Sequence, residues 1–159
     1  VTAGGAIELL PKGTRVEAIS DDGKTLAGNI GARAVRWRGR GGPLELGAVE
    51  GYTECYARAV SADGGRIIGN CIRRSSWKPP PGDRKAMPPV DPQASVAFVW
   101  DEDHGMRSVA DALAAAGAKL PDGWWLDEAF DICAYGVTIV GDARSPTSTN
   151  EAWMALLPR

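Results

Sequence analysis

The chain is poor in the residues on which enzyme and metal chemistry usually depend. It has one histidine, His104, and three cysteines in 159 residues. It lacks a Gly-x-Ser-x-Gly elbow, a glycine-rich phosphate loop and a Cys-x-x-Cys pair, so a hydrolase triad, a nucleotide site and a zinc site have no anchor. His104 lies between two expected strands, so we interpret it as a turn residue and keep a catalytic base as the alternative. We therefore expect no catalytic residue, no metal site and no cofactor.

Charge of one sign and long apolar segments are also missing. The 18 basic and 20 acidic residues give a net charge of −2, without the clustered basic excess that nucleic acids or membrane surfaces attract. Apolar runs are only a few residues long, so we expect no membrane span. The first residue is Val1 and not Met, so we expect that an upstream segment was removed, by signal processing or by trimming.

Glycine is abundant, with 20 residues, and it punctuates an internal repeat. Three segments align, at 19–29 (ISDDGKTLAGN), 60–70 (VSADGGRIIGN) and 132–142 (ICAYGVTIVGD). The Asp-Gly pairs of the first two predict hairpins with a tight two-residue turn, because such turns need positive φ. The third has Tyr135-Gly136 instead, so its turn type stays open. An Asp-Gly turn also explains the acidic residues near Gly23 without a calcium loop, whose spacing is absent.

Two further strands follow each of the first two hairpins, and one follows the third. Alternation of apolar residues predicts half-buried strands that begin with Ala and others that begin with Gly. The Ala-led segments are 34–37 (AVRW), 97–100 (AFVW) and, less closely, 152–155 (AWMA). The Gly-led segments are 42–46 (GPLEL), 105–109 (GMRSV) and, ahead of the first hairpin, 5–9 (GAIEL). Each unit therefore reads as four strands.

These patterns predict an all-β fold of four-stranded units of β-propeller type, with about three blades and one short helix. The first two turn glycines are 41 residues apart, which suits a blade of about 40–45 residues. We place the units in one repeat domain, at about 15–47, 56–117 and 126–158, with an inserted loop at 73–94. A strand at 5–10 would complete a neighbouring blade.

The one expected helix lies near residues 108–116. Ser108 and Asp111 have the spacing of a capping box, and Gly117 follows the alanine-rich run as a C-terminal cap. Val109 and Leu113 share one face, which would pack on a sheet.

Three blades are fewer than the 4–8 of known propeller rings. The chain is therefore expected to be part of a longer array, to combine with a second chain in one ring, or to form an open stack.

Together these pieces resemble the bacterial extracellular HAF repeat family, whose units carry an AFxW strand, a GM..LG strand and an AxxISADGxxIVG hairpin. The C-terminal segments 123–126, 128–129, 139–141 and 151–153 resemble the end of such domains. The resemblance implies secretion or surface display, often beside an autotransporter or sorting signal, and no known catalytic activity. The third hairpin departs from the pattern, with Cys-Ala-Tyr in place of Ser-Ala-Asp.

Cys55 and Cys71 lie eight residues on either side of Asp63, and so flank the second hairpin evenly. Across an antiparallel pair they would face each other, which predicts a disulfide and an oxidising compartment. Two unrelated buried thiols are the alternative. Cys133 replaces a small Ser of the repeat and is expected to be a small buried hydrophobic residue.

Candidate binding residues lie in the insertion and in one tryptophan pair. The proline-rich loop carries Arg73, Arg74 and Trp77 and is either a variable surface loop or an arm that docks a partner. Trp125 and its neighbour Trp124 would point to opposite faces of a strand, so one of them could be exposed and stack on a sugar or peptide. Trp37, Trp100 and Trp153 belong to the Ala-led strands and are expected in the core.

The sequence thus predicts a secreted or cell-surface, non-enzymatic binding or structural module, with the periplasm as another location. Its partner would be a protein or glycan at the cell surface, a second copy, or further blades. One alternative is a subunit of an extracellular filament joined by terminal strands. A second alternative is a secreted hydrolase or lyase of propeller type.

Overall fold

The computed structural model describes residues 5, 7, 9–39, 41–75, 78, 80–81, 91, 93–147 and 149–158. Within these ranges the chain is mainly strand with one short helix, which confirms the expected all-β class. The elements are β1 (Thr14–Ile19), β2 (Thr25–Ile30), β3 (Arg33–Arg38), β4 (Leu44–Glu45), β5 (Glu54–Val60), β6 (Arg66–Ile72), β7 (Ser95–Asp101), β8 (Gly105–Ser108), α1 (Val109–Ala115), β9 (Trp125–Ile132), β10 (Thr138–Arg144) and β11 (Asn150–Leu156).

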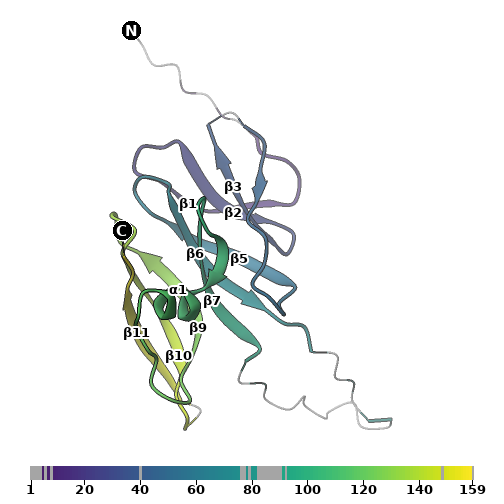
Figure 1. Ribbon diagram of the computed structural model, residues 1–159. Coiled ribbons are helices and arrows are strands. Elements are labelled where there is room, and N and C mark those ends of the chain that lie inside the picture. Colours follow the sequence, from purple (N-terminus) through teal and green to yellow (C-terminus); the bar gives the residue numbers. More distant parts are fainter. Residues whose placement is uncertain are drawn as a thin grey trace.

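The strands form three antiparallel sheets in sequence order, as Figure 1 shows from purple through teal to yellow. The first sheet has the order β1-β2-β3-β4, the middle sheet β5-β6-β7-β8 and the third sheet β11-β10-β9. Neighbouring strands are therefore consecutive along the chain. The third sheet has three strands, and the described residues Gly5, Ile7 and Leu9 belong to no strand. The expected strand at 5–10 stays a prediction, since residues 6 and 8 lie outside the described ones.

Consecutive sheets pack face to face, with the first strand of each against the sheet before it. Strand β5 contacts β1, β2 and β3, and strand β9 contacts β5, β6 and β7. The contact between the first and middle sheets contains three small residues, Ala27, Ala34 and Ala57, which are almost fully buried. Phe98 and Trp100 of the middle sheet belong to the same buried cluster. In both contacts, the first strand of a sheet therefore packs on the first three strands of the sheet before it.

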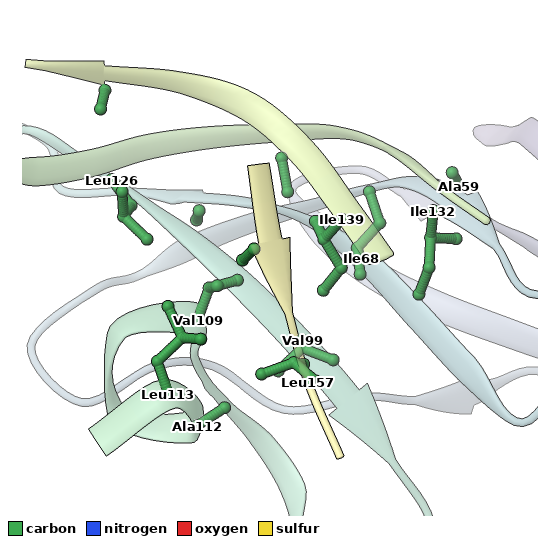
Figure 2. Packing of buried hydrophobic residues seen from close by; sticks show 14 residues of the cluster. Ala59, Ile68, Val99, Val109, Ala112, Leu113, Leu126, Ile132, Ile139 and Leu157 are labelled. Carbon is green, nitrogen blue, oxygen red and sulfur yellow. The ribbon is translucent and has the colours of Figure 1, made fainter. Parts of the chain in front are cut away.

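The second contact holds the larger core cluster, drawn in Figure 2. Ile68 and Val99 of the middle sheet pack there with Leu126 and Ile139 of the third. Burying such a side chain contributes roughly 1.5–3 kcal/mol. Of the expected core tryptophans, Trp37 and Trp100 are buried, and Trp153 is half-buried against this cluster.

The helix α1 covers one side of that cluster, as predicted. The Ser108 Oγ accepts a hydrogen bond from the Asp111 N–H (2.9 Å) and donates to its carboxylate (2.6 Å). This cap satisfies a free amide at the start of the helix. Gly117 follows at φ 83°, and Val109 and Leu113 are buried in the cluster.

A β-bulge recurs in the first strand of every sheet. Glu17, Arg58 and Phe130 are the extra residues, and each lies beside a glycine of the second strand. A Cβ on Gly28 would lie 2.1 Å from the Arg15 carbonyl oxygen, so only glycine fits there. The glycine that follows the two apolar residues of the repeat is therefore required by packing, and not by its own φ.

The hairpin turns differ from the tight two-residue turn expected from Asp-Gly. The Ser20 N–H donates to the Thr25 carbonyl (2.9 Å), so four residues lie between the paired positions. The third turn has the same form, because Gly23 and Gly136 both donate to the carbonyl three residues earlier and have φ of 69° and 71°. The expectation was wrong because the bond from the Gly23 N–H to the Ser20 carbonyl (2.9 Å) places Asp21 and Asp22 at the centre of the turn, with Gly23 after them. The Asp22 carboxylate accepts the Ser20 hydroxyl (2.7 Å).

The predicted disulfide between Cys55 and Cys71 is present. The two residues are directly opposite in the β5–β6 ladder and both are buried. Just beyond the bridge, the Arg73 N–H donates to the Ala94 carbonyl (2.8 Å), which joins the two ends of the inserted loop.

Replacing Gly28 with Ala should lower the free energy of unfolding by about 1–3 kcal/mol, because the new methyl group overlaps the backbone of β1. Urea denaturation followed by circular dichroism measures the change. Gly42→Ala is the matched control, since a Cβ there meets nothing within 4 Å, and should change stability by less than about 0.5 kcal/mol. Equal effects of the two variants would contradict the role of the bulge.

Removing the disulfide with the double variant Cys55→Ala/Cys71→Ala should cost about 3 kcal/mol, as expected for a closed loop of roughly 15 residues. The same denaturation experiment measures it. Cys133→Ala, which leaves the bridge intact, is the control and should stay within about 1 kcal/mol of the parent. A double variant as stable as the control would show that the bridge does not constrain the unfolded chain.

Candidate binding site

An aromatic cavity of about 510 Å³ lies between the middle and third sheets, on the side of α1. Three segments form it: the connection that leads into β5, the junction of β8 with α1, and the turn that leads into β9. Among its lining residues are Tyr52, Met106, Asp111, Trp124 and Trp125. Aromatic and apolar walls with a few polar groups are typical of small-ligand sites.

The two tryptophans diverge as predicted for neighbours at a strand start. Trp124 packs against the cluster between the middle and third sheets, and Trp125 against the cluster between the first and middle sheets. The Trp125 indole N–H donates to the Ser95 carbonyl (2.6 Å). This bond holds the ring half-buried, so Trp125 forms a wall of the cavity and is not an exposed stacking platform.

Tyr52 forms another wall, and its position connects the cavity with the inserted loop. Its hydroxyl donates to the Gln93 carbonyl (2.9 Å), and the Arg73 guanidinium lies over its ring, 5.2 Å from the centroid. Arg73 also donates to the same carbonyl (3.2 Å). The loop base is therefore attached directly to one wall of the cavity.

The predicted binding residues are only partly brought together. Arg73 touches the cavity wall, and Trp125 lines the cavity. Arg74 instead pairs with the mostly buried carboxylate of Glu54. Trp77 lies outside the described residues. The prediction missed Tyr52, whose only signal was an aromatic residue shortly before the bridged Cys55.

A second cavity, about 810 Å³, runs along the three hairpin turns and is lined mainly by charged residues. The Arg36 guanidinium binds Glu102 (2.7 Å) and lies over the Trp100 ring, 4.7 Å from its centroid. This pair, and the nearby charge of Arg38, lower the pKa of Glu102. The lining acids Asp101 and Glu102 are paired with arginines, whereas the Nε and Nη1 of Arg36 have no hydrogen-bond partner among the described residues. The aromatic cavity is the better candidate for a ligand because its walls offer aromatic and apolar surface.

His104 lies at the edge of this groove, and its contacts fit the expected turn role. Asp101 accepts hydrogen bonds from the His104 backbone N–H (2.9 Å) and lies 2.7 Å from its Nδ1. Burial raises the pKa of Asp101, but these bonds and the charge of Arg107 outweigh it and hold that pKa below the usual range. Among the described residues, no three His, Cys, Asp or Glu side chains are grouped as a metal site requires.

The hairpin turns share one hydrogen-bond network, in which Cys133 takes the place of a serine. The hydroxyls of Ser20 and Ser61 accept the N–H of the residue five positions later (3.0 and 2.9 Å). In the third turn the Cys133 Sγ accepts the Thr138 N–H (3.2 Å). This bond stabilises the thiolate and lowers the pKa of Cys133 to about 7. The expectation of an inert buried residue was therefore incomplete, because Cys133 is only partly buried.

Comparison of the chain with protein-family models, with curated proteins and with solved structures finds no match. No helix among the described residues has the length and apolar character that crossing a bilayer demands. The HAF resemblance thus rests on the sequence motifs alone.

Cys133 should react with iodoacetamide as a thiol of lowered pKa. Its alkylation rate should reach half of its high-pH limit near pH 7, because the thiolate is the nucleophile and is already half formed there. Mass spectrometry without reductant follows the reaction, and the Cys133→Ala variant, whose other cysteines are bridged, should incorporate no label. A midpoint near pH 9 would show that the Thr138 amide does not stabilise the thiolate.

Proposed function

We propose that the chain is an extracellular or cell-surface binding module without enzymatic activity, whose three sheets are arranged like propeller blades. The aromatic cavity carries the binding part of this proposal. It joins three segments that are distant in sequence, and two of its walls are held by side-chain hydrogen bonds, those of Tyr52 and Trp125. A preformed aromatic site of this kind suits a small ligand.

The ligand class that fits best is a sugar unit of a surface glycan. Tyrosine and tryptophan rings offer apolar faces, while Glu50 and Asp111, both exposed at the cavity, offer acceptors for hydroxyl groups. A short peptide is the second candidate, favoured by the attachment of the inserted loop at Arg73 and Tyr52.

The disulfide supports the extracellular location. Such bridges persist in oxidising compartments and are rare in the cytosol of most organisms. The blade-like arrangement is supported by the repeated strand order and by the equivalent contacts of β5 and β9 with the sheets before them.

Filling the cavity should abolish binding without unfolding the protein. Ala110 on α1 lines the cavity and is only partly buried, so Ala110→Trp places an indole inside it. We expect a glycan array to show binding by the parent that falls at least about tenfold in this variant, because the ligand loses its contact area. Ala114→Trp, at an exposed position of the same helix that does not line the cavity, is the matched control and should bind like the parent.

Binding that survives Ala110→Trp would exclude the aromatic cavity as the site. A parent protein that binds no glycan but selects peptides from a display library, with the same response to the two variants, would identify the second candidate.

A further inference from the structure

Consecutive sheets are joined by a backbone hydrogen bond that repeats between equivalent turn residues. The Asp21 N–H donates to the Ala62 carbonyl (3.1 Å), and the Ala62 N–H donates to the Ala134 carbonyl (3.0 Å). Each turn thus donates to the next one along the chain. The series leaves the carbonyl of Asp21 at one end and the N–H of Ala134 at the other, and both residues are exposed.

Side-chain contacts at the turn glycines also run from each sheet to the next one along the chain. Thr25 packs so closely on Gly64 that a Cβ there would lie 2.2 Å from its Oγ1. Arg66, which has the same place in the middle sheet, lies against Gly136 and donates to its carbonyl (2.7 Å). Gly23, the first turn glycine, has open space where the others have a neighbour.

The outer face of the third sheet is apolar and uncovered. Met154 and Leu156 are 68% and 67% exposed, and Val140 is also exposed. Val140 and Met154 align with Ile68 and Val99 of the middle sheet, which are fully buried against the third sheet. The exposed face of the third sheet is therefore equivalent to the face of the middle sheet that packs against the third sheet.

The outer face of the first sheet is the counterpart of that surface. Val16 and Ile19 of β1 are exposed. In the third sheet the equivalent residues, Ala129 and Ile132, are buried against the middle sheet. The first sheet thus presents the face that a preceding sheet covers.

In the part of the chain that the structure describes, the third sheet has three strands, and Gly5, Ile7 and Leu9 near the N-terminus belong to no strand. Ile7 and Leu9 align with Leu44 and Leu46 of the first Gly-led strand. Leu46 is 4% exposed, whereas Leu9 is 89% exposed. The segment at 5–10 therefore has the pattern to pair with β11 of a neighbour.

We propose that a second copy of this chain covers both faces, with the third sheet of each copy against the first sheet of the other. The inference rests on the blade-like arrangement proposed above. Head-to-tail contacts form a closed ring when the rotation from one copy to the next returns to the start, and open filaments when it does not. One copy holds three sheets and three copies would hold nine, whereas two copies hold six, within the 4–8 of known rings. In this ring the Ala134 N–H donates to the Asp21 carbonyl of the second copy.

The mass of the purified chain tests the proposal directly. Light scattering coupled to size exclusion should give twice the 16.8 kDa of one chain, unchanged over a wide dilution range. Ile19→Lys and Met154→Lys each place a charge in one half of the contact, and both should raise the dissociation constant of the dimer by roughly 100-fold. Leu44→Lys is the matched control, an exposed apolar position on β4, which pairs with β3 at the edge of the first sheet opposite β1, and it should leave the mass unchanged.

Mixing the two charged variants separates this contact from a symmetric one. Ile19→Lys mixed with Met154→Lys should restore a dimer, because one of the two contacts then joins unaltered faces. Dimers that only Met154→Lys disrupts would indicate third sheets packed against each other and would overturn the proposal.

A folded monomer, or open-ended polymers of the kind a filament subunit forms, would also overturn the ring. A monomer that still loses glycan binding on Ala110→Trp would do so while leaving the binding module intact. A dimer that binds nothing would support the ring and count against the module.

Discussion

The close approach of each first strand to the sheet before it is the constraint on which the rest of the molecule depends. Ala57 and Ala129 have no exposed surface, and the bulge beside each of them brings the strand backbone onto a glycine of the same sheet. Larger residues would push the sheets apart and break the hydrogen bonds between the turns. The aromatic cavity adjoins both contacts, because Tyr52 and Trp125 pack in the cluster between the first and middle sheets and Trp124 packs on the cluster between the middle and third sheets.

The features that could be predicted from the sequence were those determined by residues close together in the chain. The strand order, the capped helix and the Cys55–Cys71 bridge depend on residues that are near in sequence or aligned by a hairpin, so pattern and spacing were enough. The turn form was missed because the Gly23 N–H bonds to the Ser20 carbonyl and so places four residues between the paired strand positions, which an Asp-Gly pair alone does not specify. Comparison of the three copies could not reveal the turn form, because all three have the same number of residues between their two strands.

The candidate site was harder to predict because it is built from separate segments. Trp125 was found from composition, but its indole bond to Ser95 joins residues 30 positions apart, and no local pattern encodes it. Tyr52 meets Arg73 only because the bridge and the β5–β6 ladder align the two ends of the hairpin. Units that look alike in sequence therefore differ where loops and single aromatic residues meet.

The two ends of the inserted loop are joined to each other, and this affects how much the loop itself can vary in length. Since the disulfide and the hydrogen bond between Arg73 and Ala94 fix both ends of the loop, additions within it need not strain the β6–β7 pairing. Loop length adds little to the entropy of closure once the ends are fixed. Loops of different length and sequence can thus replace one another between β6 and β7 during evolution, and each would begin and end beside Tyr52 of the cavity.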